Sequence, residues 1–262
     1  MKILAIGDVF GKVGRRVLKI GLNNIISSVK ADFVIANGEN LAGGFGVTQE
    51  MADELFSTGV DVITSGNHIW DKKEALKLLD LEKRLLRPAN YPEDAPGRGA
   101  DLFTTKTGAK IGVLNLQGRV FMDAIDCPFK SAEKNIELLR SRTKIIIVDM
   151  HAEATSEKIA MGYFLDGRVS AIFGTHTHVQ TSDAKLLPRQ TAYITDLGMT
   201  GPSHSVIGVR PEIILKRFLL KLPERFNEAL GPGQFNGAFI ELDDETGMAK
   251  SIRPLQSSYE FQ

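Results

Sequence analysis

The stretch Phe33-Val34-Ile35-Ala36-Asn37-Gly38-Glu39-Asn40 joins a short apolar run directly to polar side chains. A bounded apolar run of this length predicts a buried strand, and the polar residues then lie where that strand ends. Residues 2–7 and 61–64 form two further runs of this kind, and a segment with helical character follows each of the three. Three successive strand–helix units predict a parallel sheet, in which functional residues belong at the carboxyl ends of the strands.

The rest of the chain adds further elements to this core. The first three helices are expected over residues 13–29, over residues 49–57 with Thr48 as the N-cap, and after Asp71, which has capping-box spacing to Glu74. The second half predicts a helix over residues 132–140, strands over residues 111–116, 144–149, 170–173 and 191–195, and a hairpin from 237–242 and 248–254 around a turn at 243–247. Loops rich in Pro and Gly at 92–99 and 231–233 are too short for interdomain linkers. We therefore expect one α/β domain, residues 1–262, with two packed mixed β-sheets flanked by helices.

Composition is that of an ordinary globular protein, with 43% hydrophobic and 24% charged residues. The formal net charge is zero, so no global field attracts nucleic acid or anionic lipid, and any anion must be attracted by a local site. A single cysteine, Cys127, excludes an internal disulfide framework and fits a reducing cytosol. The apolar run at the N-terminus is too short for a signal peptide or a membrane span, so we expect a cytoplasmic protein that does not contact a membrane.

Four of the five histidines, two carboxylates and two asparagines lie in five short segments at predicted strand ends. The segments are Gly7-Asp8, Gly38-Glu39-Asn40, Gly66-Asn67-His68, His151 and Gly174-Thr175-His176-Thr177-His178. Residues spaced in this way can converge at one edge of one sheet. Their donors are oxygen and imidazole nitrogen without thiolate, which suits manganese, iron(II) or zinc. The pattern predicts a two-metal hydrolase site.

Taken alone, each segment also has an ordinary structural interpretation. Asp8 has the position of a helix N-cap, and in isolation this interpretation is favoured by roughly two to one. Glu39 could be a solvated loop charge, but its two carboxylate oxygens can bridge two cations, and the glycines after Asn40 indicate backbone shaped around something close. Asn67 suits a turn, yet it offers a neutral carbonyl ligand, and His68 beside it can donate a proton to a leaving oxygen.

His176 and His178 have the most informative spacing. In an extended segment, residues i and i+2 project to one side, which favours ligation of one metal centre by both imidazoles. His151 ends an apolar strand, and Asp149, two residues earlier, is placed to orient its imidazole. His204 has no such context and is predicted to be a loop residue.

The five segments, in this order, resemble the calcineurin-like metallophosphoesterase superfamily, and most closely its bacterial YmdB-like cyclic-nucleotide phosphodiesterases. The resemblance runs from Met1 to beyond Gly208 and includes the segments 7–11, 38–40, 151–157 and 174–178. The general superfamily pattern has a histidine where this chain has Phe10 and an aspartate where it has Glu39. Both departures agree with the YmdB-like branch. The resemblance implies the metallophosphoesterase sandwich fold, with helix, sheet, sheet and helix layers (αββα).

The same resemblance implies a ligand set for two divalent metals, iron or manganese. One metal would be held by Asp8, Glu39, Asn40 and His178, and the other by Glu39, Asn67, His151 and His176, with Glu39 as the bridge. His68 would be the general acid, and 2′,3′- and 3′,5′-cyclic nucleotides the substrates. Two divalent cations, two carboxylates and one bridging hydroxide leave a net charge of about +1, which matches a phosphodiester better than a dianionic monoester.

Two other functions remain open from the sequence. One is a phosphomonoesterase or 5′-nucleotidase on the same scaffold. The other is a non-catalytic regulator with a structural metal, whose partner is a protein or RNA. The expected partner is a small-molecule cyclic nucleotide, with nucleic acid only as the source of an RNA-derived cyclic phosphate, and a homo-oligomer is compatible with the sequence.

Overall fold

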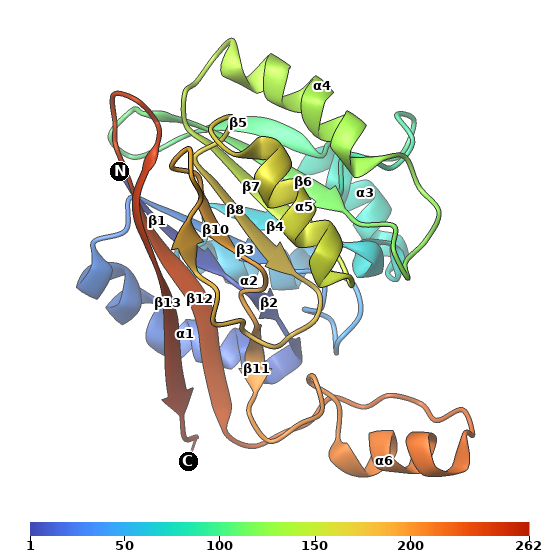
Figure 1. The fold of residues 1–262 in the computed structure, drawn as a ribbon. Coiled ribbons are helices and arrows are strands. Elements are labelled where there is room, and N and C mark those ends of the chain that lie inside the picture. Colours follow the sequence, from blue (N-terminus) through green and yellow to red (C-terminus); the bar gives the residue numbers. More distant parts are fainter. Residues whose placement is uncertain (262) are drawn as a thin grey trace.

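Two β-sheets lie face to face between two layers of helices in the computed structural model, which describes residues 1–261 (Figure 1). The first sheet has the strand order β2-β11-β12-β1-β3-β4, with β13 paired to β12. Its strands are β1 (Lys2–Ile6), β2 (Asp8–Val9), β3 (Phe33–Asn37), β4 (Val62–Thr64), β11 (Met199–Pro202), β12 (Gly233–Leu242) and β13 (Ala249–Tyr259). Strands β1, β3 and β4 are parallel, as the three strand–helix units predict, and β12 pairs with β1 in the antiparallel sense. The sheet is therefore mixed.

The second sheet has the order β5-β6-β7-β8-β10-β9. Its central strands β6, β7, β8 and β10 are parallel, and the two edge strands pair with them in the antiparallel sense. The strands are β5 (Ala100–Thr104), β6 (Lys110–Gln117), β7 (Ile146–His151), β8 (Ala171–Thr175), β9 (Lys185–Leu186) and β10 (Ala192–Ile194).

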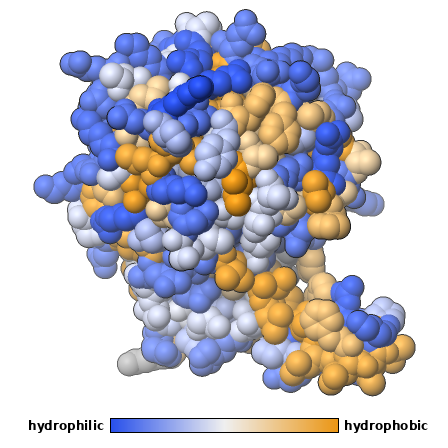
Figure 2. Space-filling model, viewed as in Figure 1, coloured by the Kyte–Doolittle hydropathy of each residue, from blue (hydrophilic) through white to orange (hydrophobic). Residues whose placement is uncertain are grey.

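Helices cover the outer face of each sheet. The first sheet is covered by α1 (Gly11–Val29), α2 (Gln49–Ser57) and α3 (Lys73–Leu81), and the second by α4 (Pro128–Arg140) and α5 (Thr155–Leu165). A short 3-10 helix, η1 (Asn67–Trp70), follows β4. The last helix, α6 (Pro211–Leu220), projects from the body, and Figure 2 shows its surface as largely apolar.

Strand β1 shows how the sequence specifies these layers. Ile3 and Ala5 point into the core between the sheets, while Leu4 and Ile6 point into the core under the helices, because successive side chains alternate across a strand. A strand buried on both faces needs a continuous apolar run, which is the signal in its sequence. A third core lies between the second sheet and its helices. The predicted αββα sandwich is confirmed.

The predicted N-terminus of α3 is wrong in its detail. Its N-cap is Lys72, without a side-chain cap bond, because the Asp71 carboxylate bonds to His68 and the Glu74 carboxylate accepts a hydrogen bond from the Gln49 N–H. The N-cap at Thr48 is confirmed, since its side chain accepts a hydrogen bond from the Met51 N–H.

Several elements are absent from the sequence-based prediction, among them β5, α5 and α6. Helix α5 lacks a clean apolar stripe because the charged residues Glu157 and Lys158 are buried on it. In the described part of the chain, no helix combines the length and the apolar character needed to cross a membrane.

A buried ion pair fastens the loop that follows β8. Lys158 Nζ lies 2.6 Å from Asp196 Oδ2, and the two side chains are 1% and 0% exposed. The same oxygen accepts hydrogen bonds from Thr177 N at 3.2 Å and Thr177 Oγ1 at 2.7 Å. On either side of Thr177, His176 and His178 have φ values of 97° and 65°. Such positive φ values are strained for non-glycine residues and persist only where surrounding contacts hold them, which Asp196 does here.

We predict that Asp196→Ala lowers the free energy of unfolding by about 3–5 kcal/mol, because it leaves the Lys158 ammonium buried without a partner. Urea unfolding of metal-free protein measures this change. Lys130→Ala is the matched control, because it removes an exposed ion pair with Glu133 and should cost at most about 1 kcal/mol. A urea midpoint of Asp196→Ala equal to that of the wild type would contradict the stabilising role of the buried ion pair.

Candidate metal centre

The five predicted segments meet at one place in the fold. Asp8 lies in β2, directly after β1, while Glu39 and Asn40 follow β3, and Asn67 and His68 begin η1 after β4. His151 is the last residue of β7, and His176 and His178 follow β8. The first three segments thus come from the first sheet and the last two from the second. The expectation of one edge of one sheet was wrong, since the residues converge at neighbouring strand ends of both sheets.

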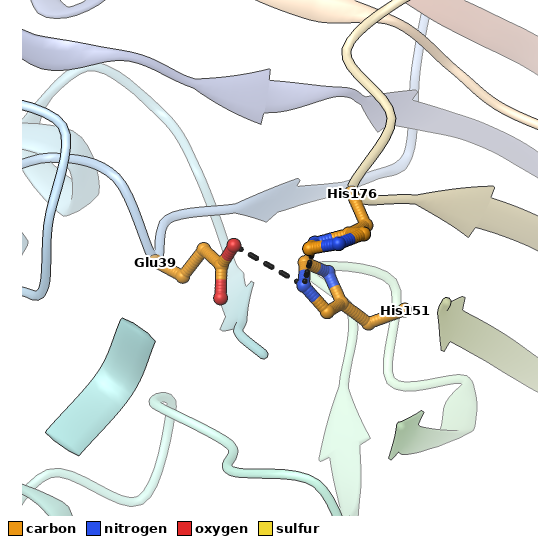
Figure 3. Close-up of side chains that lie close together, drawn as sticks. All are labelled: Glu39, His151 and His176. Atoms are coloured by element: carbon orange, nitrogen blue, oxygen red, sulfur yellow. Dashed lines mark hydrogen bonds and ion pairs between the residues drawn. The ribbon is translucent and has the colours of Figure 1, made fainter. Parts of the chain in front are cut away.

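Three lone-pair atoms converge on Nε2 of His151. Glu39 Oε1 lies 3.1 Å from it, Asn67 Oδ1 3.2 Å and His176 Nδ1 3.0 Å. Figure 3 shows the Glu39 carboxylate and the His176 imidazole directed toward the His151 ring. Ligand atoms of Glu39, His151 and His176 all lie within 4.8 Å of one another. Together with Asn67, these are the four residues that the resemblance assigns to one metal.

The ionisation of this group follows from its burial and its charges. Burial alone would raise the pKa of Glu39, but the neighbouring His151 outweighs it and lowers that pKa to about 2. Burial would lower the pKa of His151, yet the Glu39 carboxylate raises it above the ordinary value. For His176, burial and the nearby His151 charge lower the pKa to about 3. The metal-free centre therefore concentrates a proton on His151, surrounded by three acceptors.

This arrangement fits a divalent cation. A single N–H can form one good hydrogen bond, whereas three acceptors point at it, and a cation among them would satisfy all the lone pairs at once. Asn40 Oδ1 is also buried and has no hydrogen-bond partner. Carboxylate, amide oxygen and imidazole are the donors that manganese, iron and zinc accept.

Asp8, Asn40 and His178 form a looser group next to this cluster. His178 Nε2 lies 3.7 Å from Asp8 Oδ1, and the Asp8 carboxylate accepts a hydrogen bond from the His176 N–H at 3.2 Å. Burial raises the pKa of Asp8. Asp8 is not a helix N-cap, since α1 begins after Phe10 and has no side-chain cap. Asn40 donates from Nδ2 to Gly44 O at 2.8 Å, which leaves its oxygen free for a ligand.

Each of the three histidines has its other ring nitrogen engaged by the protein. His151 Nδ1 lies 2.9 Å from Thr175 Oγ1, and His178 Nδ1 lies 2.9 Å from Ile207 O. His176 Nε2 lies 3.2 Å from Glu153 Oε2. Metal-binding histidines commonly have their second nitrogen held in this way, which fixes the ring. The pattern leaves Nε2 of His151, Nε2 of His178 and Nδ1 of His176 to face the centre.

Asp149 orients His151 through an intermediary. Thr175 Oγ1 lies 2.8 Å from Asp149 Oδ1 and also contacts His151, so the carboxylate acts through the threonine. Burial raises the pKa of Asp149 to about 6. Asn37 Nδ2 donates to Asp149 Oδ2 at 3.2 Å, and Thr64 also donates to this carboxylate.

The extended conformation that the spacing of His176 and His178 predicted is wrong. Strand β8 ends at Thr175, and the positive φ values of both histidines show that the segment is not extended. The loop, held by Asp196, turns both rings toward the centre. His204 lies exposed in a bend, as expected for a loop residue.

His68 stands beside the cluster and has a different set of contacts. Its backbone N–H donates a hydrogen bond to Glu39 Oε2 at 3.0 Å, and its ring Nδ1 lies 2.8 Å from Asp71 Oδ2. The ring also meets the Phe45 ring edge-on, with centroids 4.9 Å apart. With Nδ1 engaged by Asp71, Nε2 is the nitrogen left to act on a ligand.

A cavity of about 260 Å³ opens over these residues. Its polar wall consists of Glu39, Asn40, His68, Glu153, His176, Thr177 and His178, and its apolar wall of Phe10, Phe45, Ile207, Val209 and Phe226. No lysine or arginine lines it among the described residues.

Sequence reasoning did not assign roles to several of these residues. Glu153 has a usable signal, because it lies two residues after His151 in a segment shared with the resembling family. Asn37 is a buried polar residue at the end of an apolar strand, which is a signal for a network. Phe226 has no usable signal in the sequence, because only the fold brings the segment after α6 to the cavity. Gly66 permits the close approach of η1 to His151, whose Nε2 would lie 2.1 Å from a Cβ at this position.

Comparisons with known proteins agree on one family for this chain. The sequence model of the family described as YmdB-like protein matches residues 4–255. The 2′,3′-cyclic-nucleotide 2′-phosphodiesterase of Bacillus subtilis (strain 168) is 47% identical over 252 residues, which are 96% of this chain and 95% of that protein.

Two solved structures share the whole fold. A hypothetical protein from Thermus thermophilus has a TM-score of 0.93 and 40% identity, covering 99% of this chain and 100% of its own. A novel phosphatase from Mycoplasma pneumoniae has a TM-score of 0.93 and 37% identity, covering 99% and 94%. With nearly the whole chain matched in sequence and in structure, this protein belongs to the YmdB-like family of phosphoesterases.

Proposed function

We propose that this chain is a metal-dependent phosphodiesterase that hydrolyses 2′,3′- and 3′,5′-cyclic nucleotides at a two-metal centre. The observation that carries the proposal is the convergence of Glu39, Asn67 and His176 on His151 Nε2, beneath a cavity that His68 also lines. The name of the Bacillus subtilis relative supports the 2′,3′-cyclic substrate class.

Seven residues would hold the two metals. Glu39, Asn67, His151 and His176 would bind one ion, and Asp8, Asn40 and His178, with Glu39 as the bridge, the other. Two divalent ions, iron or manganese in this proposal, would supply Lewis acidity and an activated water for attack on phosphorus. The protein holds the ligands in place through Thr175, Glu153, Ile207 and Asp196.

His68 would protonate the leaving oxygen. Asp71 engages Nδ1 of the ring, so Nε2 is the nitrogen that is available to the substrate. His68 is not among the seven proposed metal ligands; its backbone N–H contacts Glu39 and its Nδ1 contacts Asp71. A purely structural metal site has no use for such a residue, which argues against a non-catalytic regulator.

The charge of the cavity favours a diester. Glu39 and Glu153 line the cavity above the buried Asp8, and no lysine or arginine among the described residues lines it to balance a dianion. A phosphomonoester therefore fits less well than a singly charged cyclic diester. Phosphomonoesterase activity remains the second candidate, because the Mycoplasma pneumoniae structure is described as a novel phosphatase.

We predict about two metal ions per chain, by the logic of two-metal sites. Elemental analysis of protein purified without chelator measures them. Glu39→Gln should lose metal and activity together, because it removes the charge that both ions share. Glu133→Gln, which changes a side chain on α4 that is 43% exposed, is the control and should retain both. One firmly bound ion per wild-type chain would contradict the two-metal proposal.

We predict that kcat/KM is higher for 2′,3′-cyclic AMP than for 3′-AMP or 5′-AMP, because the centre offers little charge for a dianion. Parallel steady-state assays on one metal-loaded preparation give the comparison. Efficient cleavage of the monoesters without cleavage of the cyclic diester would make the phosphomonoesterase the correct assignment.

We predict that His68→Ala slows cyclic-nucleotide hydrolysis by ~10²–10⁴-fold, the usual contribution of general acid catalysis, with metal content unchanged. The loss should shrink for an aryl phosphodiester, because a weakly basic leaving oxygen needs little protonation. His204→Ala replaces an exposed histidine outside the cavity and is the matched control. Loss of metal in His68→Ala as severe as in Glu39→Gln would show that His68 is a ligand.

A further inference from the structure

The apolar wall of the cavity contains a pair of aromatic rings. Phe45 and Phe226 lie with their planes 9° apart and their centroids 6.2 Å apart. Phe45 belongs to the loop after β3, and Phe226 to the segment after α6, so the fold and not the local sequence pairs them. Both rings line the cavity and are only partly buried, whereas Phe10 beneath them is 4% exposed.

This wall suits a flat, neutral ring. The side chains of Phe45, Phe226, Ile207 and Val209 offer no hydrogen-bond donor or acceptor, so they cannot read the edge of a base. Aromatic rings at a binding surface do stack on bases, and such stacking tolerates every base because each has a π-face. The same cavity is also lined by candidate metal ligands, among them Glu39 and His178, and the phosphate belongs beside them.

The position of the pair relative to His68 bears on the bond that breaks. The Phe45 ring touches the His68 ring, with centroids 4.9 Å apart. In a nucleoside 2′,3′-cyclic phosphate, O2′ is attached to the carbon next to the one that carries the base, and O3′ is one carbon farther away. A base lying on Phe45 therefore brings O2′ closer to His68 than O3′.

We infer that Phe45 and Phe226 form a nucleobase-stacking subsite, and that these two residues direct cleavage to the P–O2′ bond, which is the bond stated in the name of the Bacillus subtilis 2′-phosphodiesterase. The inference rests on the proposed cyclic-nucleotide phosphodiesterase activity. In the selected reaction, the oxygen of water bonds to phosphorus, the P–O2′ bond breaks, and O2′ takes a proton from His68. The product is the nucleoside 3′-phosphate, and His68 regains its proton as the attacking water releases one.

The test compares substrates with and without a base. The substrates are 2′,3′-cyclic AMP, 2′,3′-cyclic UMP and methyl β-D-ribofuranoside 2′,3′-cyclic phosphate, which has no base. The variants are Phe226→Ala and Phe226→Leu, the second of which keeps apolar bulk but has no flat ring. Phe218→Ala is the control, because Phe218 is 66% exposed on α6 and does not line the cavity. Phosphorus NMR distinguishes the 2′- and 3′-phosphate products, and metal content is measured for every variant.

We predict that Phe226→Ala and Phe226→Leu lower kcat/KM for cyclic AMP about tenfold, within the range that alanine substitution of base-stacking aromatics gives. The base-free riboside should react equally with wild type and variants, and Phe218→Ala should match the wild type on all substrates. Wild type should favour the purine over the pyrimidine and yield only 3′-phosphate from cyclic AMP. The Phe226 variants should yield both isomers, because the ribose is no longer held in one orientation.

Several results would overturn the inference. An equal loss of kcat/KM on the nucleotide and on the base-free riboside would show that the rings support the metal centre and do not bind a base. Wild-type kinetics in the Phe226 variants would show that no base lies there. Pure 3′-phosphate from variants with reduced kcat/KM would refute the selection of O2′. Failure of wild type to cleave any of the three cyclic phosphates would refute the proposed function instead.

Discussion

Nε2 of His151 is the point on which the centre is organised. Two sheets deliver a carboxylate, an amide oxygen and a second imidazole to within 3.2 Å of this one nitrogen. An arrangement of buried lone pairs around a single proton is costly without a cation, because buried polar groups need partners. The sandwich can hold it because β3, β4, β7 and β8 are buried on both faces and keep their ends fixed. The strand ends thus hold together polar groups whose close approach is unfavourable without a bound cation.

A layer of supporting contacts lies behind the candidate ligands. Thr175 and Asp149 hold His151, Glu153 holds His176, and the Ile207 carbonyl holds His178. Asp196 restrains the strained loop between His176 and His178 and is itself neutralised by Lys158. These contacts fix which nitrogen of each ring faces the centre. They explain why polar residues are buried on β7 and α5, where a simple core would place apolar ones.

The layers of the fold, and the strand ends at which polar side chains gather, could be predicted from the sequence, whereas the detailed contacts could not. Apolar runs such as residues 33–37 predict strands that are buried on both faces. The polar residues that follow these runs predict the site, because the carboxyl ends of parallel strands lie at the same edge of a sheet. The pairing of the two sheets at one edge, the positive φ values of His176 and His178, and the contact of Asp71 with His68 depend on tertiary structure. Helix α5 was missed because Lys158 and Glu157 are buried by specific partners, Asp196 and the amides of Arg119 and Val120. The contact between Phe45 and Phe226 could not be predicted from the sequence, because the two residues are 181 positions apart in the chain.

The central claim is that the lone pairs around His151 exist to bind a metal and that a second metal shares Glu39. Crystals soaked in Mn²⁺ and measured at the manganese absorption edge test it directly through anomalous difference density. The claim predicts two peaks roughly 3.5–4 Å apart on either side of the Glu39 carboxylate. One should lie among His151 Nε2, His176 Nδ1 and Asn67 Oδ1, and the other among Asp8, Asn40 and His178 Nε2. A single peak, or density away from Glu39 with His151 still bonded to its carboxylate, would contradict the claim.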